Sequence, residues 1–254
     1  MDLIKKISNS LDKKATISKI RYSSWVATLD SDLADTDDHE DHKVEESDWI
    51  FWELERPLEG NCEMNILTFD DPEGQMTFWH SSAHILGGAL EIGFGVHLCY
   101  GPPTSEGFYY DAYCGEDKFA ESDYANIEKF AEKMIKDKHK FERLVLSKSE
   151  ALELFAYNPF KIQLISSKIA ENGKATAYRC GHLIDLCTGP HLPNTALVKA
   201  FKIMKNSSSY WLGNSKNDSL QRVYGVSFPS KEKLAEHIHF IEEAKLRDHW
   251  VIGA

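Results

Sequence analysis

The sequence predicts an α+β fold, in which strands and helices are mixed rather than repeated in strand–helix–strand units. Two observations predict this class. Stretches with the two-residue period of a strand are interspersed with stretches of helical period, in no regular alternation. Hydrophobic residues make up 42% of the 254 residues, which is ordinary for a globular protein and allows a sizeable core.

The first part of the chain predicts a small unit of one helix and three strands. Residues 2–12 place apolar side chains on one helical face. Residues 30–48 are thick with Asp, Glu and His and nearly lack apolar side chains, so we expect an exposed, disordered loop there. A turn at 70–74 closes this part. The strands are expected at 15–29, 49–54 and 62–69.

The second part opens on a helix expected at 75–92, which Gly93 and Gly95 interrupt. Ser147 and Glu150 have the spacing of a capping box and predict a helix start. The remaining helices are expected at 123–140, 149–157 and 231–248, and the strands at 96–100, 161–166, 176–185 and 197–204. A loop with Gly101-Pro-Pro and Glu106-Gly107 is expected to lead into 108–111.

Charge and cysteine content limit the functional classes. Residues 1–75 hold 8 Lys and Arg against 19 Asp and Glu, so the net charge of −11 lies entirely in this part and residues 76–254 are neutral. A nucleic-acid ligand would therefore need a local basic patch. The 5 cysteines are scattered without a CxxC pair, which favours reduced thiols and a cytoplasmic location. No apolar run predicts a membrane span.

Two short motifs carry side chains that bind metals or move protons. His80 and His84 are four residues apart in a helical stretch and project from one face. Cys187 and His191 flank Gly189-Pro190 and can fold back to one side. Together they form a plausible tetrahedral zinc set, or a pocket that holds and activates water without a metal. Ser81 stands where HExxH metalloproteases carry their glutamate, so a zinc protease is not expected.

Longer strings around these motifs resemble threonyl-tRNA synthetase of the eukaryotic cytoplasmic type, in its amino-terminal region. The resemblance is dense over about 50–249. The strings are His80-Ser-Ser-Ala-His84-Ile-Leu-Gly, Gly101-Pro-Pro, Gly107-Phe-Tyr-Tyr-Asp111, Asp185-Leu-Cys-Thr-Gly-Pro-His191, Tyr210-Trp211 and Leu220-Gln-Arg-Val-Tyr-Gly225.

The resemblance implies three regions. Residues 1–72 would form an incomplete β-grasp module, the TGS domain, with 30–48 as an acidic insertion and without the usual first hairpin. Residues 75–230 would form the editing domain, the second additional domain of threonyl and alanyl tRNA synthetases. Residues 231–254 would be a helical connector toward a class II catalytic core, whose motifs do not occur in this sequence. We therefore expect no aminoacylation by this chain alone; ATP, a further zinc ion and the homodimer contact would belong to that core.

By the same resemblance, the editing domain would hydrolyse serine wrongly attached to the 3′ end of threonine tRNA. His80 and Lys161 would position or activate water, and Asp185 would hold the serine ammonium. His84, Cys187 and His191 would line the pocket, and Tyr109 and Tyr110 would form its wall or stack on the terminal adenine. No cofactor would be required, and zinc, if bound, would lie between His80, His84, Cys187 and His191.

Basic residues near a predicted strand are candidates for tRNA contact, or for a solvated charged edge: Lys199, Lys202, Lys205 and Arg222. Two rival functions remain open from the sequence. One is a non-catalytic module that grips the tRNA acceptor arm. The other is a zinc-dependent hydrolase of the alanyl type.

Overall fold

The computed structural model describes Ile4, Lys6 and residues 9–25 and 49–252, so the acidic stretch 30–48 lies outside the described residues. The helices are α2 (Asn9–Asp12), α3 (Pro72–Phe94), α4 (Tyr124–Lys136), α5 (Lys148–Leu154), α6 (Pro159–Lys168) and α7 (Lys231–Ile252). The strands are β1 (Ala15–Trp25), β2 (Ile50–Trp52), β3 (Gly60–Thr68), β4 (His97–Tyr100), β5 (Pro103–Thr104), β6 (Gly107–Tyr113), β7 (Phe141–Ser147), β8 (Lys174–Cys180), β9 (Leu183–Leu186), β10 (Ala200–Tyr210) and β11 (Ser219–Phe228).

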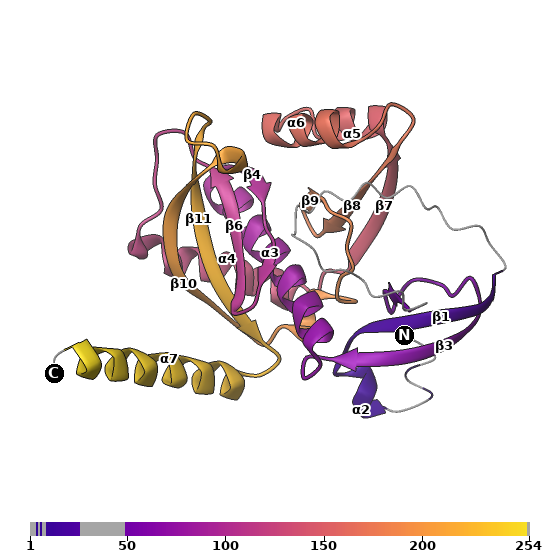
Figure 1. The fold of residues 1–254 in the computed structure, drawn as a ribbon, viewed down its shortest axis with the longest axis horizontal. Helices are drawn as coiled ribbons and strands as arrows, with labels where there is room; N and C mark the ends of the chain where they lie inside the picture. Colours follow the sequence, from indigo (N-terminus) through magenta and orange to yellow (C-terminus); the bar gives the residue numbers. More distant parts are fainter. Residues whose placement is uncertain (1–3, 5, 7–8, 26–48, 253–254) are drawn as a thin grey trace.

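The strands form three antiparallel sheets in the described part of the chain, which confirms the α+β class. The first sheet has the order β2-β1-β3 and packs with α2. The largest has the order β10-β11-β6-β4, with β5 beside β6, and α3 and α4 cover one of its faces (Figure 1). The third, β7-β8-β9, lies beside α5 and α6.

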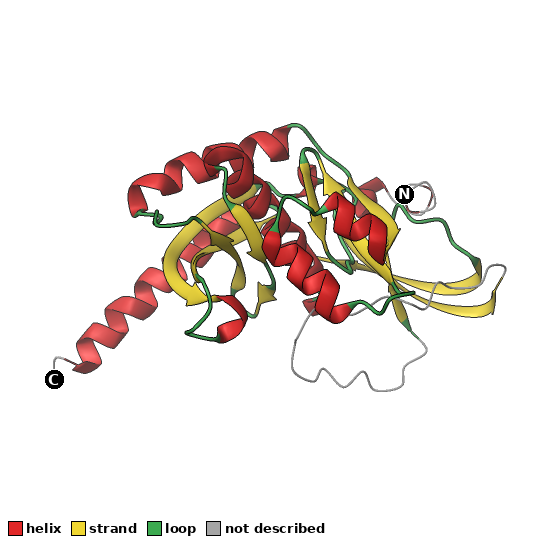
Figure 2. Ribbon diagram, turned by 90° about the horizontal axis from the view of Figure 1, so that it is seen from above, coloured by secondary structure: helices red, strands yellow, loops and turns green. Residues whose placement is uncertain are grey.

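Helix α3 is the central element of the fold, because it contacts all three sheets. In Figure 2, the helix that ends at the carboxyl terminus, α7, extends away from the other elements. Most residues of α3 are buried, including three of its glycines and Ser81 and Ser82. Small side chains let neighbours approach closely: a Cβ on Gly87 would lie 2.8 Å from the Tyr110 ring, and one on Gly88 2.6 Å from Met134. The histidines of α3 are thus held on a tightly packed element.

Two sequence predictions of strands were wrong for local reasons. Residues 161–166 belong to helix α6, not to a strand. Asn158 accepts hydrogen bonds from the backbone N–H of Phe160 and Lys161, and Pro159 occupies the first turn, so a cap and a proline start a helix despite the alternating apolar pattern. The single strand expected at 176–185 is two strands, because Gly181 turns the chain at φ +64°.

Other expectations agree with the structure. The capping box at the start of α5 is present: Ser147 accepts from the Glu150 N–H, and the Glu150 carboxylate accepts from the Ser147 N–H. Strands β7 and β11 were not predicted, although part of β11 is one of the family strings. No helix in the described part of the chain is long and apolar enough to cross a membrane.

The close approach at the start of α3 gives a test of the fold. A Cβ on Gly74 would lie 1.9 Å from the Thr68 carbonyl oxygen. We expect Gly74→Ala to lower the free energy of unfolding by about 1–3 kcal/mol, because backbone must move to admit the methyl group. Urea unfolding measures this. The neighbouring change Gln75→Ala should stay within about 0.5 kcal/mol; equal stability of both variants would show that α3 does not begin as described.

Candidate functional site

Three imidazoles meet at one face of α3. His80 and His84 are one helical turn apart, and their ring centroids are 5.4 Å apart. The ring of His191 lies 4.5 Å from each of them. The structure therefore brings the two distant motifs together. His191 lies 107 or more residues along the chain from His80 and His84.

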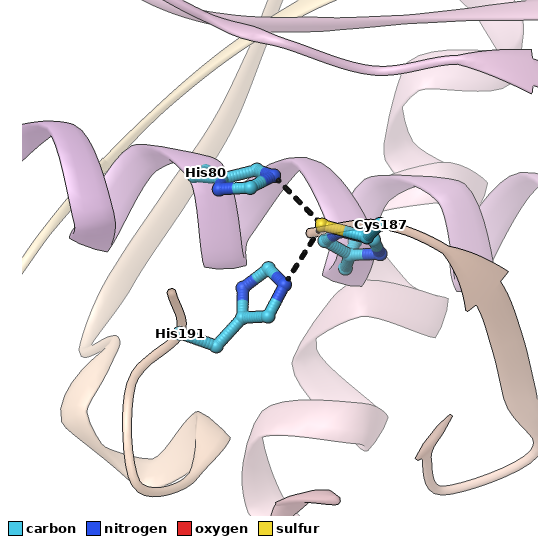
Figure 3. A group of neighbouring side chains, drawn as sticks. His80, Cys187 and His191 are labelled. Atoms are coloured by element: carbon cyan, nitrogen blue, oxygen red, sulfur yellow. Dashed lines mark hydrogen bonds between the residues drawn. The ribbon is translucent and has the colours of Figure 1, made fainter. Parts of the chain in front are cut away.

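Cys187 closes this cluster (Figure 3). Its Sγ lies 3.2 Å from His80 Nε2 and 3.2 Å from His191 Nε2. The sulfur also accepts the Gly189 N–H at 3.2 Å. Gly189 has φ +77°, and a Cβ there would lie 2.3 Å from the Tyr178 hydroxyl, so this turn needs glycine. The Gly-Pro turn thus brings Cys187 and His191 to one side, as their spacing predicts.

Asp185 is the electrostatic centre of the site and is 2% exposed. Lys161 Nζ lies 2.6 Å from its Oδ1, and His84 Nδ1 lies 3.1 Å from its Oδ2. The Tyr110 hydroxyl donates a short hydrogen bond to Oδ2. Burial alone would raise the pKa of Asp185, but the Lys161 charge and the His84 hydrogen bond outweigh it and hold that pKa below its ordinary value.

His191 is the most enclosed imidazole, at 1% exposed. It stacks on Phe141 with ring centroids 5.0 Å apart and an angle of 17° between the planes. Its Nδ1 lies 3.1 Å from Ser81 Oγ. Burial lowers the pKa of His191 well below its ordinary value, and the neighbouring His80 and His84 lower it further. We therefore expect His191 to be neutral at pH 7, because its surroundings disfavour the protonated imidazole.

The cluster opens into a small pocket of about 30 Å³, enough for one water molecule. Five residues of its wall were not predicted as site residues, because their side chains carry no motif of their own. The lining residues are His80, His84, Cys99, Tyr100, Gly101, Tyr110, Lys161, Leu164, Asp185, Leu186 and Cys187.

A larger cavity of about 390 Å³ lies near the carboxyl end of α3, around Glu91, His97 and Tyr157. Burial raises the pKa of Glu91, and the negative charge of Asp185 adds to this shift. The cavity is lined by none of the clustered histidines and by no cysteine. Size alone does not make it the reactive centre, so we place the candidate site at the smaller pocket, where acid–base groups converge.

The four-residue cluster has the chemistry of a metal site. The donor atoms of His80, His84, Cys187 and His191 all lie within 4.8 Å of one another. One cysteine and three histidines are a common zinc set. His84 Nδ1 contacts Asp185, and His191 Nδ1 contacts Ser81. In zinc sites, the ring nitrogen of a histidine that does not bind the metal usually contacts a polar group in the same way. The cluster could therefore hold a metal such as zinc.

Tyr109 and Tyr110 are separated by the alternation of β6. Tyr110 reaches the pocket, whereas Tyr109 is not among the pocket residues. Its ring packs against Arg222, whose Cζ lies 3.9 Å from the ring centroid, and against Tyr224. The geometry thus brings only one of the two predicted tyrosines to the site.

The residues predicted to contact tRNA differ in whether their charges are paired with a carboxylate. Arg222 forms two hydrogen bonds of 2.7 Å with Asp111, and Lys202 lies 3.2 Å from Glu128, so both charges are largely matched. Lys199 and Lys205 are exposed and form no ion pair with a described residue. Lys205 instead lies over the Tyr224 ring at 4.7 Å.

Comparison with known proteins identifies the domain type. Residues 175–224 match the model of the threonyl and alanyl tRNA synthetase second additional domain. This segment contains Asp185, Cys187 and His191. The fold and the clustered site thus define an editing-type domain of these tRNA synthetases.

Similar proteins give the particular family. The cytoplasmic threonine–tRNA ligase of Saccharomyces cerevisiae is 41% identical over 267 residues, covering 100% of this chain and 33% of the yeast protein. A probable cytoplasmic threonine–tRNA ligase 1 of Dictyostelium discoideum is 50% identical over 202 residues, covering 80% of this chain and 28% of that protein. The chain is therefore homologous to cytoplasmic threonyl-tRNA synthetases and spans about a third or less of their length, which confirms the resemblance. Their names agree with the cytoplasmic location expected from the cysteines.

The buried ion pair can be tested by removing one charge. We expect Lys161→Gln to lower the free energy of unfolding by about 3–5 kcal/mol, because Asp185 would keep a buried charge without its cation. Urea unfolding at pH 7 measures this. The control is Lys140→Gln, which breaks an exposed pair with Glu55 and should leave the unfolding midpoint unchanged. A Lys161→Gln variant as stable as this control would contradict the ion pair.

Metal content tests the two chemical interpretations of the cluster. The family resemblance favours a pocket that works without a metal, so we expect protein purified without added zinc to contain far less than one zinc per chain. Elemental analysis by mass spectrometry measures the ratio, with Cys187→Ala as the control. Stoichiometric zinc in the parent chain that is lost in Cys187→Ala would overturn this expectation and favour the alanyl type of site.

Proposed function

We propose that this chain hydrolyses the ester that joins serine to the 3′ end of threonine tRNA, as the proofreading part of a threonyl-tRNA synthetase. The observation that carries the proposal is a pocket for one water molecule that is lined by His80, His84 and Cys187 together with the Lys161–Asp185 pair. His191 does not line this pocket, but its ring completes the cluster behind Cys187. The homology of this chain to threonine–tRNA ligases supports a tRNA substrate. In keeping with the resemblance, residues 1–72 would be the TGS-like module and 75–230 the editing domain.

A second site of this kind answers a discrimination problem. Threonine and serine differ by one methyl group, and a missing methyl changes binding by only about 1–3 kcal/mol. A synthetic site that accepts threonine therefore accepts some serine. A separate hydrolytic pocket that admits serine and excludes the extra methyl corrects the error. The walls of Leu164, Leu186 and Cys99 give this pocket rigid, close-packed sides.

Hydrolysis needs a positioned water, a proton acceptor and a group that stabilises the developing oxyanion. His80 lies at the cluster next to Cys187 and can orient the water. His80 is also the candidate to accept the water proton and to return it to the departing ribose oxygen, whereas the lowered pKa of His191 makes that imidazole a poor proton acceptor. Lys161 Nζ contacts the Asp185 carboxylate at 2.6 Å, and its proposed role is to attract the water or the developing oxyanion. These steps need no metal.

Asp185 would have a partly different role from the one that the resemblance implies. Its oxygens already contact Lys161, His84 and Tyr110, so a serine ammonium would have to share them. We propose that Asp185 mainly orients Lys161 and His84, and that it attracts the ammonium through its negative charge. Its contact at His84 Nδ1 leaves Nε2 of that ring directed to the cluster.

The zinc-dependent alternative is kept because the donor set fits it. His80, His84, Cys187 and His191 would hold the ion. Because four ligands fill a tetrahedral site, a water would have to add as a fifth ligand for zinc to lower its pKa and supply hydroxide. Asp185 and Ser81 would then fix the orientation of the ligand rings. Mischarged alanine tRNA would be the substrate in that case.

Deacylation of aminoacyl-tRNA tests the proposal. We expect the chain to release serine from Ser-tRNA(Thr) and to leave Thr-tRNA(Thr) intact, measured by loss of labelled amino acid from the tRNA. His80→Ala and His84→Ala should each slow release by about 100-fold or more, because each removes an acid–base or water-orienting group. His97→Ala and His182→Ala, which line the larger cavity, should have no effect.

Two other results would point elsewhere. Tight binding of Ser-tRNA(Thr) with no turnover at saturating protein would favour a non-catalytic module for the acceptor arm. Faster release from mischarged alanine tRNA than from Ser-tRNA(Thr), lost on chelation, would favour the zinc-dependent alanyl type.

A further inference from the structure

A carboxylate from the first sheet reaches the wall of the candidate site. Glu53 follows β2 directly, and its Oε1 accepts a hydrogen bond of 3.0 Å from the backbone N–H of His191. The two residues are 138 positions apart in the sequence. Glu53 lies outside residues 175–224, which match the second additional domain. It nevertheless contacts His191, one of the four clustered residues, directly.

Tyr178 joins this contact to the turn. Its hydroxyl is hydrogen-bonded to the Glu53 carboxylate and packs closely against Gly189. Its ring meets the His191 ring edge-on, with centroids 4.4 Å apart. Glu53 thus holds His191 in two ways: directly through the backbone, and indirectly through the tyrosine that flanks the imidazole.

Two neighbouring backbone N–H groups attach this turn to other parts of the structure. The next backbone N–H, that of Leu192, donates to Ser81 Oγ at 2.9 Å, and Ser81 also contacts His191 Nδ1. The turn is therefore held from α3 on one side and from Glu53 on the other. Without an acceptor, the His191 N–H would be a buried donor with no partner, and the turn would shift to satisfy it.

We infer that Glu53 is a positioning residue of the hydrolytic site, so that the small N-terminal sheet completes the pocket built by the editing domain. The inference rests on the proposed function for its catalytic consequence, but its structural part is independent of it. Glu53 fixes His191 and, through the contact of His191 with Cys187, the far side of the cluster.

The geometry shows Glu53 Oε1 as the hydrogen-bond acceptor of the His191 N–H. Desolvation raises the pKa of Glu53, so its surroundings do not favour the ionised form, although the contacts with Tyr178 and His191 offset part of that effect. A glutamine at this position keeps a side-chain oxygen that can accept the His191 N–H. Alanine removes the acceptor altogether. The two substitutions therefore separate positioning from charge.

The test compares hydrolysis of Ser-tRNA(Thr) by the full chain and its variants. We expect Glu53→Ala to lower kcat about tenfold with KM within twofold, because the pocket is misaligned while tRNA contacts remain. Glu53→Gln should restore most of the rate. The matched control is Glu55→Ala, which removes a carboxylate from the same segment that pairs with Lys140 rather than with the site, and it should behave as the parent chain.

A second readout does not require activity. Amide hydrogen exchange at His191, followed by NMR, should be at least tenfold faster in Glu53→Ala than in the parent, unchanged in Glu55→Ala and close to the parent in Glu53→Gln. Tyr178→Phe, which keeps the ring, should give an intermediate rate if Glu53→Ala proves too unstable to study. If the parent chain does not hydrolyse Ser-tRNA(Thr), the proposed function fails while this measurement still tests Glu53. Unchanged exchange at His191 in Glu53→Ala, or equally slow hydrolysis by Glu55→Ala, would overturn the inference.

Discussion

The structure around the site depends on the burial of one carboxylate, Asp185. An unpaired charge at 2% exposure would be strongly unfavourable, so its oxygens need partners. Those partners come from three other elements: Lys161 from α6, His84 from α3 and Tyr110 from β6. The requirement to satisfy Asp185 therefore fixes α3 and α6 relative to two sheets. The geometry of the reactive cluster follows from this, because His84 belongs to both the carboxylate network and the cluster.

Close packing makes this arrangement stiff. α3 has small side chains where it meets Tyr110 and Met134, and Tyr110 would collide with a Cβ on either Gly87 or Gly101. The ring that bonds Asp185 is thus held between two glycines. A functional group carried on a helix whose neighbours leave no free volume keeps its position more accurately than one on a loop. His191, the cluster member on a turn, is the one that needs contacts from Ser81 and Glu53.

Local signals in the sequence predicted part of this structure. The spacing of His80 and His84 predicts a shared helical face, and the Ser147–Glu150 box predicts a helix start, since each depends on residues within one turn. Asn158 and Pro159, which start α6, are also local signals, but the apolar alternation from Phe160 onward is typical of a strand, and the strand predicted at 161–166 was wrong. Lys161 was placed in the site by resemblance alone. Glu53 had no local signal, because no periodicity relates it to His191.

Under the proposed function, discrimination between serine and threonine would depend on this stiffness. Differential attraction is weak for one methyl group, so a proofreading pocket must rely on exclusion. Exclusion requires that the residues of the pocket wall keep their positions. Inserting one extra methyl into a rigid site costs about 1–3 kcal/mol, and this cost would disappear if the wall moved to admit the methyl. A buried charge with three partners resists movement, because any displacement breaks an ion pair or hydrogen bond in a region that water does not reach. Under the proposed function, the same carboxylate that positions Lys161 and His84 would therefore also make the pocket selective.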